Sequence, residues 1–211
     1  MLADDWKWFT TGFEWLADYA TGWQFGEQGM LVALMEMAIE NYDFDKVCVE
    51  IGAGDGLSLP LTLEPFVKAG WHLHAYEMNA SNRASLGEVL LQYNAFSIHG
   101  AFDNDSTIPD NASLVVIDVD SIDEYIMTKA LKNCSPVVLM VEHYDIAGPH
   151  VTGASDFHKQ VPRWLCGMPL FNEFRIQARH ERLDDIASYN GYSPVARTRV
   201  NSIYIKDEID V

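Results

Sequence analysis

Residues 49–56, with the sequence VEIGAGDG, carry the main fold signal of this chain. The segment starts with residues that are typical of a buried strand and ends in a turn that contains three glycines. Glycine adopts backbone angles that other residues avoid, and it lets a ligand approach the backbone amides closely. A strand that runs through such a turn into a helix is typical of α/β proteins that bind nucleotides.

Apolar runs and helical patterns alternate along the chain on both sides of this loop. Runs rich in β-branched residues predict buried strands at residues 46–51, 72–76, 96–99, 114–119 and 137–141. Helical patterns separate these runs at residues 59–69, 81–93 and 122–132. Because parallel strands need crossover connections, the alternation predicts an α/β fold with a doubly wound, mostly parallel sheet.

The C-terminal region changes this pattern. A helix is expected at residues 173–188, followed by two apolar runs at residues 194–200 and 202–205. Their close spacing predicts that the two runs pair as an antiparallel hairpin. Residues 24–211 would then form a single domain. Residues 145–160 lack clear periodicity and are a candidate active-site loop, because irregular segments of that length are usually functional or mobile.

The first 23 residues are rich in aromatic side chains. They contain four of the six tryptophans, and Phe9, Phe13 and Leu16 have the spacing of one helical face. We interpret residues 1–23 as an N-terminal helical extension that packs on the main domain. A lid or a contact between two copies, giving a homo-oligomer, is the alternative, because such aromatic surface is costly to expose.

A second helix is expected at residues 26–41. Its apolar positions have helical spacing and predict one buried face. The residues expected on this face are Met30, Leu31, Leu34, Met35 and Ala38.

Composition and charge exclude several classes of function. The chain carries 14 Lys and Arg against 31 Asp and Glu, a formal net charge of −17. Nucleic acid is held by clustered cations, so we do not expect it as a partner. The first residues lack the positive charge of a secretory signal, and no apolar run is long enough to span a membrane. We therefore expect a cytoplasmic protein without membrane contact.

Three cysteines, Cys48, Cys134 and Cys166, show no Cys-x-x-Cys spacing. An odd number without that spacing argues against a disulfide framework or a cysteine-rich zinc site. We expect buried free thiols.

The spacing within the glycine loop narrows the choice of ligand. In the dinucleotide fingerprint Gly-x-Gly-x-x-Gly the third glycine comes one residue later than Gly56, at the position of Leu57. Glu77 ends the next strand, about 20 residues further on, where an acid can accept hydrogen bonds from ribose hydroxyls. A nucleoside ligand is favoured over a dinucleotide. The alternative is that the glycines and the acid only shape turns.

Motifs along the chain extend this pattern: QFGEQG at residues 24–29, the glycine loop with Glu77, and DVDSID at residues 118–123. The glycine loop and Glu77 resemble the first two motifs of class I S-adenosylmethionine-dependent methyltransferases. The whole set resembles a subfamily of methyltransferase-like proteins that pairs QFGEDG with DIDGxD. The chain departs from that subfamily at Gln28, Ser121 and Glu124, and at His143 and Tyr144.

The resemblance implies a Rossmann-like methyltransferase fold with S-adenosyl-L-methionine as the cofactor. In that fold Glu50 and the loop would hold the amino-acid part of the cofactor, and Glu77 would hold the ribose. The segment after the third strand of the domain would border the adenine. The complete cofactor set expected is Glu50, Gly52, Ala53, Gly54, Gly56, Glu77, Ala101, Phe102, Asp103 and Asp118.

Candidate catalytic residues follow from strand ends, where ligands bind in open α/β sheets. His143 is the first candidate base because imidazole titrates near neutral pH, and Asp120 is the second. A structural role for His143 is the alternative. His72 and His74 share one strand face and are interpreted as packing residues.

A metal site is the weaker interpretation of the same strand ends. Carboxylates and imidazole are metal ligands, but no tight motif such as His-Glu-x-x-His occurs, so no metal is predicted. The weak candidate ligands are Asp118, Asp120, Glu142 and His143.

These observations predict a methyltransferase-like enzyme that transfers a methyl group to a small, non-nucleic-acid acceptor at oxygen. Two alternatives come from other classes. One is a non-catalytic nucleoside-binding or assembly module on the same fold, and the other is a metal-dependent hydrolase or lyase.

Overall fold

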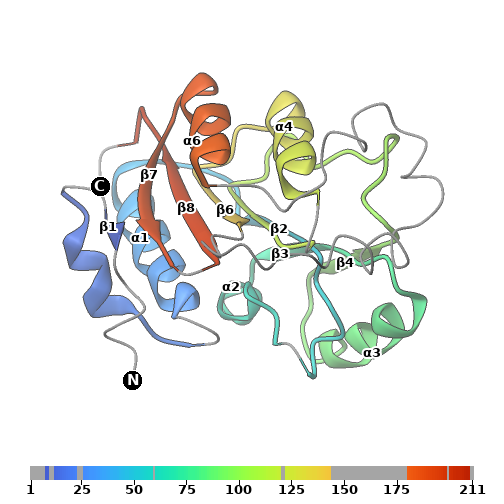
Figure 1. Ribbon diagram of the computed structural model, residues 1–211. Helices are drawn as coiled ribbons and strands as arrows, with labels where there is room; N and C mark the ends of the chain where they lie inside the picture. The colour runs from blue at the N-terminus through green and yellow to red at the C-terminus, as the bar shows by residue number, and fades with distance from the viewer. Residues whose placement is uncertain are drawn as a thin grey trace, which may run out of the picture.

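The computed structural model describes residues 8–9, 12–22, 26–58, 60–119, 122–143, 180–198 and 200–209. Helices and strands alternate through most of these ranges (Figure 1). The strands are β1 (Trp8–Phe9), β2 (Val47–Ile51), β3 (His72–Tyr76), β4 (Phe96–His99), β5 (Leu114–Ile117), β6 (Val138–Glu142), β7 (Tyr192–Arg197) and β8 (Asn201–Lys206). The helices are the 3₁₀ helix η1 (Glu14–Tyr19), α1 (Glu27–Asn41), α2 (Glu64–Lys68), α3 (Ala80–Leu90), α4 (Asp123–Asn133) and α6 (His180–Tyr189).

One mixed sheet contains the described strands in the order β1-β7-β8-β6-β5-β2-β3-β4. The five strands from β2 to β6 are parallel, and β8 joins β6 in antiparallel register. The predicted doubly wound α/β fold with an antiparallel C-terminal strand pair is therefore confirmed. The strand order reverses between β2 and β5, so the loops that follow these two strands diverge at that point.

Helices cover both faces of the sheet (Figure 1). The buried apolar side chains of α1, α2 and α3 belong to one hydrophobic cluster, and those of α4 and α6 belong to another. In β5, Leu114 and Val116 join the first cluster, whereas Val115 and Ile117 join the second. This two-sided burial explains why β5 is a continuous apolar run.

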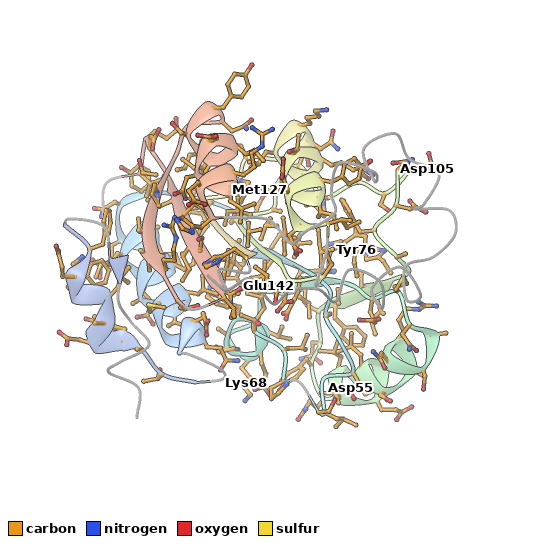
Figure 2. All side chains as sticks on the ribbon, in the orientation of Figure 1. Asp55, Lys68, Tyr76, Asp105, Met127 and Glu142 are labelled. Atoms are coloured by element: carbon orange, nitrogen blue, oxygen red, sulfur yellow. The ribbon has the colours of Figure 1, made fainter. Side chains whose placement is uncertain are left out.

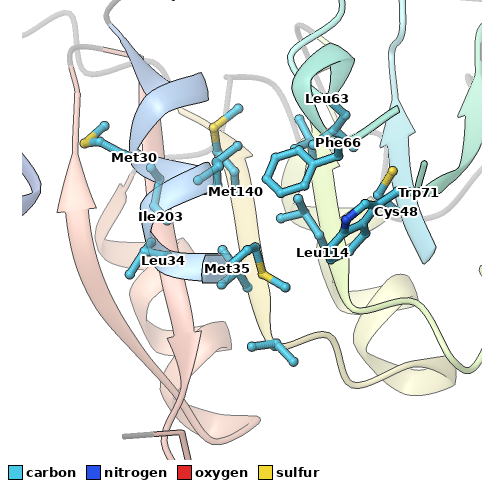
Figure 3. Close-up of a cluster of buried hydrophobic side chains, with 14 of the residues drawn as sticks. Met30, Leu34, Met35, Cys48, Leu63, Phe66, Trp71, Leu114, Met140 and Ile203 are labelled. Atoms are coloured by element: carbon cyan, nitrogen blue, oxygen red, sulfur yellow. The ribbon is translucent and has the colours of Figure 1, made fainter. Parts of the chain in front are cut away.

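The first cluster is centred on α1 and the segment around α2. Figure 3 shows Met30, Leu34 and Met35 beside Met140 and Ile203, and it shows Leu63, Phe66 and Trp71 beside Leu114. The predicted inward face of α1 is confirmed, because all five of its residues are buried. Burial of side chains of this size stabilises the fold by about 1.5–3 kcal/mol each.

Helix α2 is shorter than the sequence pattern predicts. It covers only Glu64–Lys68, with a proline at one of its first two positions, whereas a helix was expected at residues 59–69. Pro65 fits a helix start because it lacks a backbone N–H, and Pro60 cannot continue a helix from the preceding turn.

The N-terminal region contains a strand where a helix was expected. Trp8 and Phe9 pair with Arg197 and Ala196 as strand β1, so Phe9 does not belong to a helix. Gly12 has a φ of +100°, which interrupts a right-handed helix, and only the short helix η1 follows. Leu16 of η1 is fully buried, while Trp6 and Trp23 lie outside the described residues.

The described cysteines match the expectation. Cys48 and Cys134 are free and buried, and burial raises the pKa of both thiols. Cys166 lies outside the described residues, as do residues 145–160 and the first part of the helix expected at 173–188. Within the described ranges, no helix has the length and apolar character needed to cross a membrane.

Candidate functional site

The glycine loop leaves β2 at the point where the strand order reverses. Gly52 has a φ of +92°, and a Cβ atom there would lie 1.6 Å from the backbone oxygen of Asp118. Its N–H donates to the Tyr76 carbonyl at 2.8 Å. Gly52 is therefore required because the ends of β2, β3 and β5 meet at this residue. The neighbouring Ala53 N–H donates to the same carbonyl at 3.1 Å.

Glu77, which follows β3, contacts the loop directly. Its Oε2 atom accepts the Gly54 N–H at 2.9 Å, and its Oε1 atom accepts the Asn79 N–H at 2.6 Å. A carboxylate has about four acceptor positions, so each oxygen can take one more donor. The structure thus brings together two residues that the sequence placed in one site.

Glu50 lies under the loop and is 5% exposed. Its Oε1 atom accepts the Thr62 N–H at 2.9 Å, and its Oε2 atom accepts the Leu63 N–H at 3.0 Å. Burial raises the pKa of this carboxyl to about 7; the two amide hydrogen bonds oppose that rise, and Asp118 adds to it. Glu50 therefore anchors the segment between the loop and α2.

The segment after β4 forms an apolar wall beside Glu77. Phe102 is buried and meets the Tyr76 ring edge to face, with centroids 5.1 Å apart. The ammonium of Lys129 lies 4.7 Å from the Phe102 ring centroid, and it donates to the Asp103 carbonyl. Ala101 directly precedes Phe102 and Asp103, and its carbonyl accepts the Ser106 hydroxyl at 3.3 Å.

The Asp103 side chain closes a local turn. Its Oδ1 atom accepts the Ser106 hydroxyl at 2.8 Å and the Ser106 N–H at 3.0 Å. The Ser106 hydroxyl is the main cause that lowers the pKa of the Asp103 carboxyl. Asp103 thereby fixes the chain that carries Phe102.

Asp118 follows β5, and Glu142 is the last residue of the neighbouring strand β6. The Asp118 N–H donates to the Ile51 carbonyl at 2.9 Å, which holds Asp118 beside the glycine loop. Tyr76 and Glu142 lie at the same edge of the sheet, at the ends of β3 and β6 (Figure 2). Asp120 and Tyr144 lie outside the described residues.

His143 follows β6 and is 1% exposed. Its backbone N–H donates to the Val200 carbonyl at 2.6 Å, next to the start of β8. Its ring meets the His180 ring edge to face, with centroids 5.9 Å apart. The candidate base is thus held at the carboxyl edge of the sheet, and its catalytic role stays a prediction.

A stack of aromatic rings connects β3 and β4. His72 and His74 lie 4.7 Å apart between ring centroids, and His99 lies 4.5 Å from Tyr76. His74 Nδ1 and His99 Nε2 are 3.2 Å apart and share a hydrogen bond. Burial, with smaller effects of His72 and His99, lowers the pKa of His74 to about 4, so this ring is neutral at pH 7. These contacts agree with a packing role for His72 and His74.

No group of three or more His, Cys, Asp or Glu side chains within the described ranges is arranged to hold a metal ion. Three of the weak candidate ligands, Asp118, Glu142 and His143, lie within the described ranges, and Asp120 lies outside them.

Glu27, Thr198 and Asn201 form a buried polar cluster that the sequence did not predict. Glu27, at the start of α1, accepts hydrogen bonds from the side chains of Thr198 and Asn201 at 3.0 Å each. The neighbouring Gln28 Nε2 donates to the Leu61 carbonyl at 2.8 Å. The QFGEQG motif marked this helix start, but nothing local in the sequence indicates contacts with residues more than 170 positions away.

Comparison with known proteins gives matches at the level of structure. No protein-family model matches the chain, and no curated protein sequence matches it. The fold is similar to the CMeT domain of citrinin polyketide synthase, with a TM-score of 0.56 and 12% identity. That match covers 93% of this chain and 53% of the other, so the chain spans about half the length of that structure.

A second similar structure is the N-methyltransferase NodS from Bradyrhizobium japonicum WM9. Its TM-score is 0.53 at 9% identity, and the match covers 86% of this chain and 97% of NodS. TYW2 from M. jannaschii in complex with AdoMet also matches, with a TM-score of 0.42, 14% identity and coverage of 83% and 75%. The chain has the Rossmann-like fold of class I methyltransferases.

Proposed function

We propose that the protein is an S-adenosylmethionine-dependent methyltransferase that acts on a small, non-nucleic-acid acceptor at oxygen. The observation that carries this proposal is the hydrogen bond from the Gly54 N–H to the Glu77 carboxylate, 2.9 Å long, beside the strand-order reversal. It joins the two groups that a ribose and an amino-acid moiety would contact. NodS, which is similar with a TM-score above 0.5, is named as an N-methyltransferase, and this supports the same reaction class.

The residues at this end of the sheet fit the chemistry of the cofactor. S-adenosylmethionine carries a positive sulfonium and a positive amino group, and carboxylates at Glu77 and Asp118 suit a cation. Each Glu77 oxygen has acceptor capacity left for a ribose hydroxyl. Tyr76 and Phe102 would provide the apolar wall for the adenine. The bound cofactor supplies the methyl group on its sulfonium, activated for displacement.

Glu50 would act on this site through the backbone. Its carboxylate accepts the Thr62 and Leu63 N–H groups, so it sets the path of the chain that leaves the loop. Ala53 and the glycines Gly52, Gly54 and Gly56 would then present their backbone to the amino-acid part of the cofactor.

His143 is the proposed base on the acceptor side. A hydroxyl nucleophile has to lose its proton as the methyl group is transferred, and an imidazole accepts a proton near neutral pH. The backbone hydrogen bond to Val200 holds His143 at the end of β6, so the base would be aligned before the acceptor binds. Alignment of this kind can remove about 7–11 kcal/mol of the barrier. Asp120 is the second candidate.

The acidity of the chain supports a small acceptor. With a net charge of −17, the protein would repel a phosphate backbone. We propose a cytoplasmic location, and we propose that residues 1–23 serve as an extension of the domain at residues 24–211 that packs on it or contacts a second copy.

Titration calorimetry with S-adenosylmethionine and S-adenosylhomocysteine tests the proposal, with NAD as the control. Saturable binding of both adenosyl ligands, together with transfer of labelled methyl from S-adenosylmethionine to hydroxyl compounds in an acceptor panel, is expected. If neither S-adenosylmethionine nor S-adenosylhomocysteine binds, the proposal is contradicted. Binding without transfer to any acceptor would favour a non-catalytic module, and thermal stabilisation by divalent metals alone would favour a hydrolase or lyase.

A further inference from the structure

The first turn of α1 contacts both parts of the proposed site, the acceptor side at His143 and the cofactor side at the segment that Glu50 anchors. Glu27 contacts the turn beside His143, and Gln28 contacts the segment that Glu50 anchors. We infer that Glu27 is a positioning residue for His143, acting through Thr198 and Asn201. The functional meaning of this inference rests on the proposed methyltransferase activity, but the geometry can be tested without it.

The Glu27 carboxylate draws together two residues of the turn between β7 and β8. Its Oε1 atom accepts the Thr198 hydroxyl at 3.0 Å and the Asn201 side-chain N–H at 3.0 Å. Glu27, Thr198 and Asn201 are each at most 2% exposed. Hydrogen bonds to a buried carboxylate are strong and directional, so this contact fixes both partners relative to α1.

The same turn carries the acceptor of the His143 backbone. Thr198 and Asn201 close it with two bonds, from Thr198 N–H to the Asn201 carbonyl at 2.8 Å and from Asn201 N–H to the Thr198 hydroxyl at 3.0 Å. Val200, inside the turn, accepts the His143 N–H at 2.6 Å. Any displacement of Thr198 and Asn201 therefore moves the carbonyl that holds His143.

Stability alone is a weak reason for an acid at this position. A buried carboxylate loses its hydration, and replacing a buried polar network with apolar residues is often neutral or stabilising. The Thr198 hydroxyl links the two parts of the arrangement, because it donates to Glu27 and accepts from the Asn201 backbone. The Glu27 carboxylate instead fixes the position of the turn that holds His143 at the end of β6.

Gln28 provides a matched comparison on the same helix turn. Its side-chain N–H reaches the Leu61 carbonyl, next to the Thr62 and Leu63 amides that Glu50 accepts. A change at Gln28 should affect the cofactor side, and a change at Glu27 should affect the His143 side. Glu40, exposed near the other end of α1, gives a control for general effects on the helix.

The experiment measures amide hydrogen exchange by NMR in the full chain and in Glu27→Ala, Glu27→Gln, Gln28→Ala and Glu40→Gln. In Glu27→Ala we expect exchange at the His143 and Asn201 amides to rise about tenfold or more, with central strands β2 and β5 unchanged. Glu27→Gln keeps a carbonyl oxygen acceptor and should restore most of the protection. Gln28→Ala and Glu40→Gln should leave His143 unchanged.

Unchanged exchange at His143 in Glu27→Ala would overturn the inference. An equal rise in all strands would also overturn it, because that pattern indicates general destabilisation. If Glu27→Ala does not fold, Thr198→Val tests the same link, since it removes the hydroxyl that joins Glu27 to the Asn201 backbone. The same local rise at His143 is expected, and its absence would overturn the inference.

Calorimetry with S-adenosylmethionine on the same samples separates this inference from the proposed function. If the unmodified chain does not bind the cofactor, the methyltransferase proposal fails, while the exchange data still decide whether Glu27 positions His143. If it binds, Glu27→Ala should keep the cofactor Kd within about threefold and lower kcat for an acceptor from the panel. A large loss of cofactor affinity in this variant would overturn the division between the two sides.

Discussion

Glu77 and Gly54 are joined by a hydrogen bond of 2.9 Å from the loop amide to the carboxylate. The bond connects the end of β3 to the loop after β2 across two parallel neighbouring strands. Because Glu77 also accepts the Asn79 N–H, the carboxylate is oriented before any ligand arrives. An oriented carboxylate can bind a ribose diol with less loss of side-chain entropy than a free one.

Replacing Glu77 with alanine should weaken S-adenosylmethionine binding strongly. A hydrogen bond to a charged group is worth about 1.5–3 kcal/mol, so we expect the Kd to rise about 10- to 150-fold. Titration calorimetry measures the change, and Glu88→Ala, on the exposed side of α3, is the control. An unchanged Kd in Glu77→Ala would remove the ribose assignment.

Replacing Gly52 with alanine should destabilise the fold. The new Cβ would lie 1.6 Å from the Asp118 carbonyl oxygen, and the φ of +92° is strained for any L side chain. We expect a loss on the order of 3 kcal/mol or more in the free energy of unfolding, measured with urea. Gly100→Ala is the matched control, because a Cβ there meets nothing within 4 Å. Equal stability of the two variants would disprove the steric account.

Glu50 should make stability depend on pH in an unusual direction. Its pKa is raised to about 7 in the folded state, from an ordinary value of 4.5, so the folded protein binds the proton more tightly than the unfolded chain. The stability from this group is fully present below about pH 4.5 and is lost as the pH rises through 7. Relative to Glu50→Gln, the unmodified protein should therefore become less stable between pH 5 and 7.5.

Urea unfolding at several pH values checks this prediction. In Glu50→Gln, the side-chain carbonyl oxygen can accept only one of the two backbone N–H groups. The loss of the other hydrogen bond changes the free energy of unfolding of this variant by an amount that does not depend on pH. The quantity to follow is the difference in free energy of unfolding between the unmodified protein and Glu50→Gln. We expect this difference to change by a few kcal/mol over this pH range. A difference that stays constant from pH 5 to 7.5 would show that Glu50 does not titrate there.

Replacing His143 with glutamine should lower the rate of methyl transfer and leave cofactor binding intact. General-base catalysis contributes about 10²–10⁴ in rate, so we expect kcat to fall by that factor. The S-adenosylmethionine Kd should not change, because His143 lies at the end of β6 and not beside Glu77. His72→Gln, in the histidine stack, is the control. Full activity of His143→Gln would point to Asp120 as the base.

Strands were the part of the fold that the sequence predicted best. His72–Tyr76 and Phe96–His99 have the predicted bounds. The β5 strand is the continuous apolar run that is expected of a strand buried on both faces. Helix bounds were less reliable where the prolines near α2 limited the helix to Glu64–Lys68. At the N-terminus, the pairing of Trp8 with Arg197 depends on a strand near the other end of the chain.

The candidate site was predicted unevenly for a similar reason. Glycines and Glu77 fall at strand ends, so their meeting follows from the order of parallel strands. The binding of the Glu50 carboxylate to Thr62 and Leu63 depends on how the chain returns after the loop, which no local pattern encodes. Glu27 meets Asn201 only because α1 packs over the strands that come last in the chain.

Strand β1 covers part of the edge that β7 would otherwise present at this side of the sheet. Backbone groups of Arg197 and Ala196 on β7 are already paired with β1, and Pro194 cannot donate a hydrogen bond from this strand. In the pairing of β7 with β8, the register is irregular between Pro194 and Ala196, which interrupts the regular ladder along β7. Among the described strands, β7 therefore offers little of its edge to a further strand, and the two borders of the sheet are β1 and the four-residue strand β4.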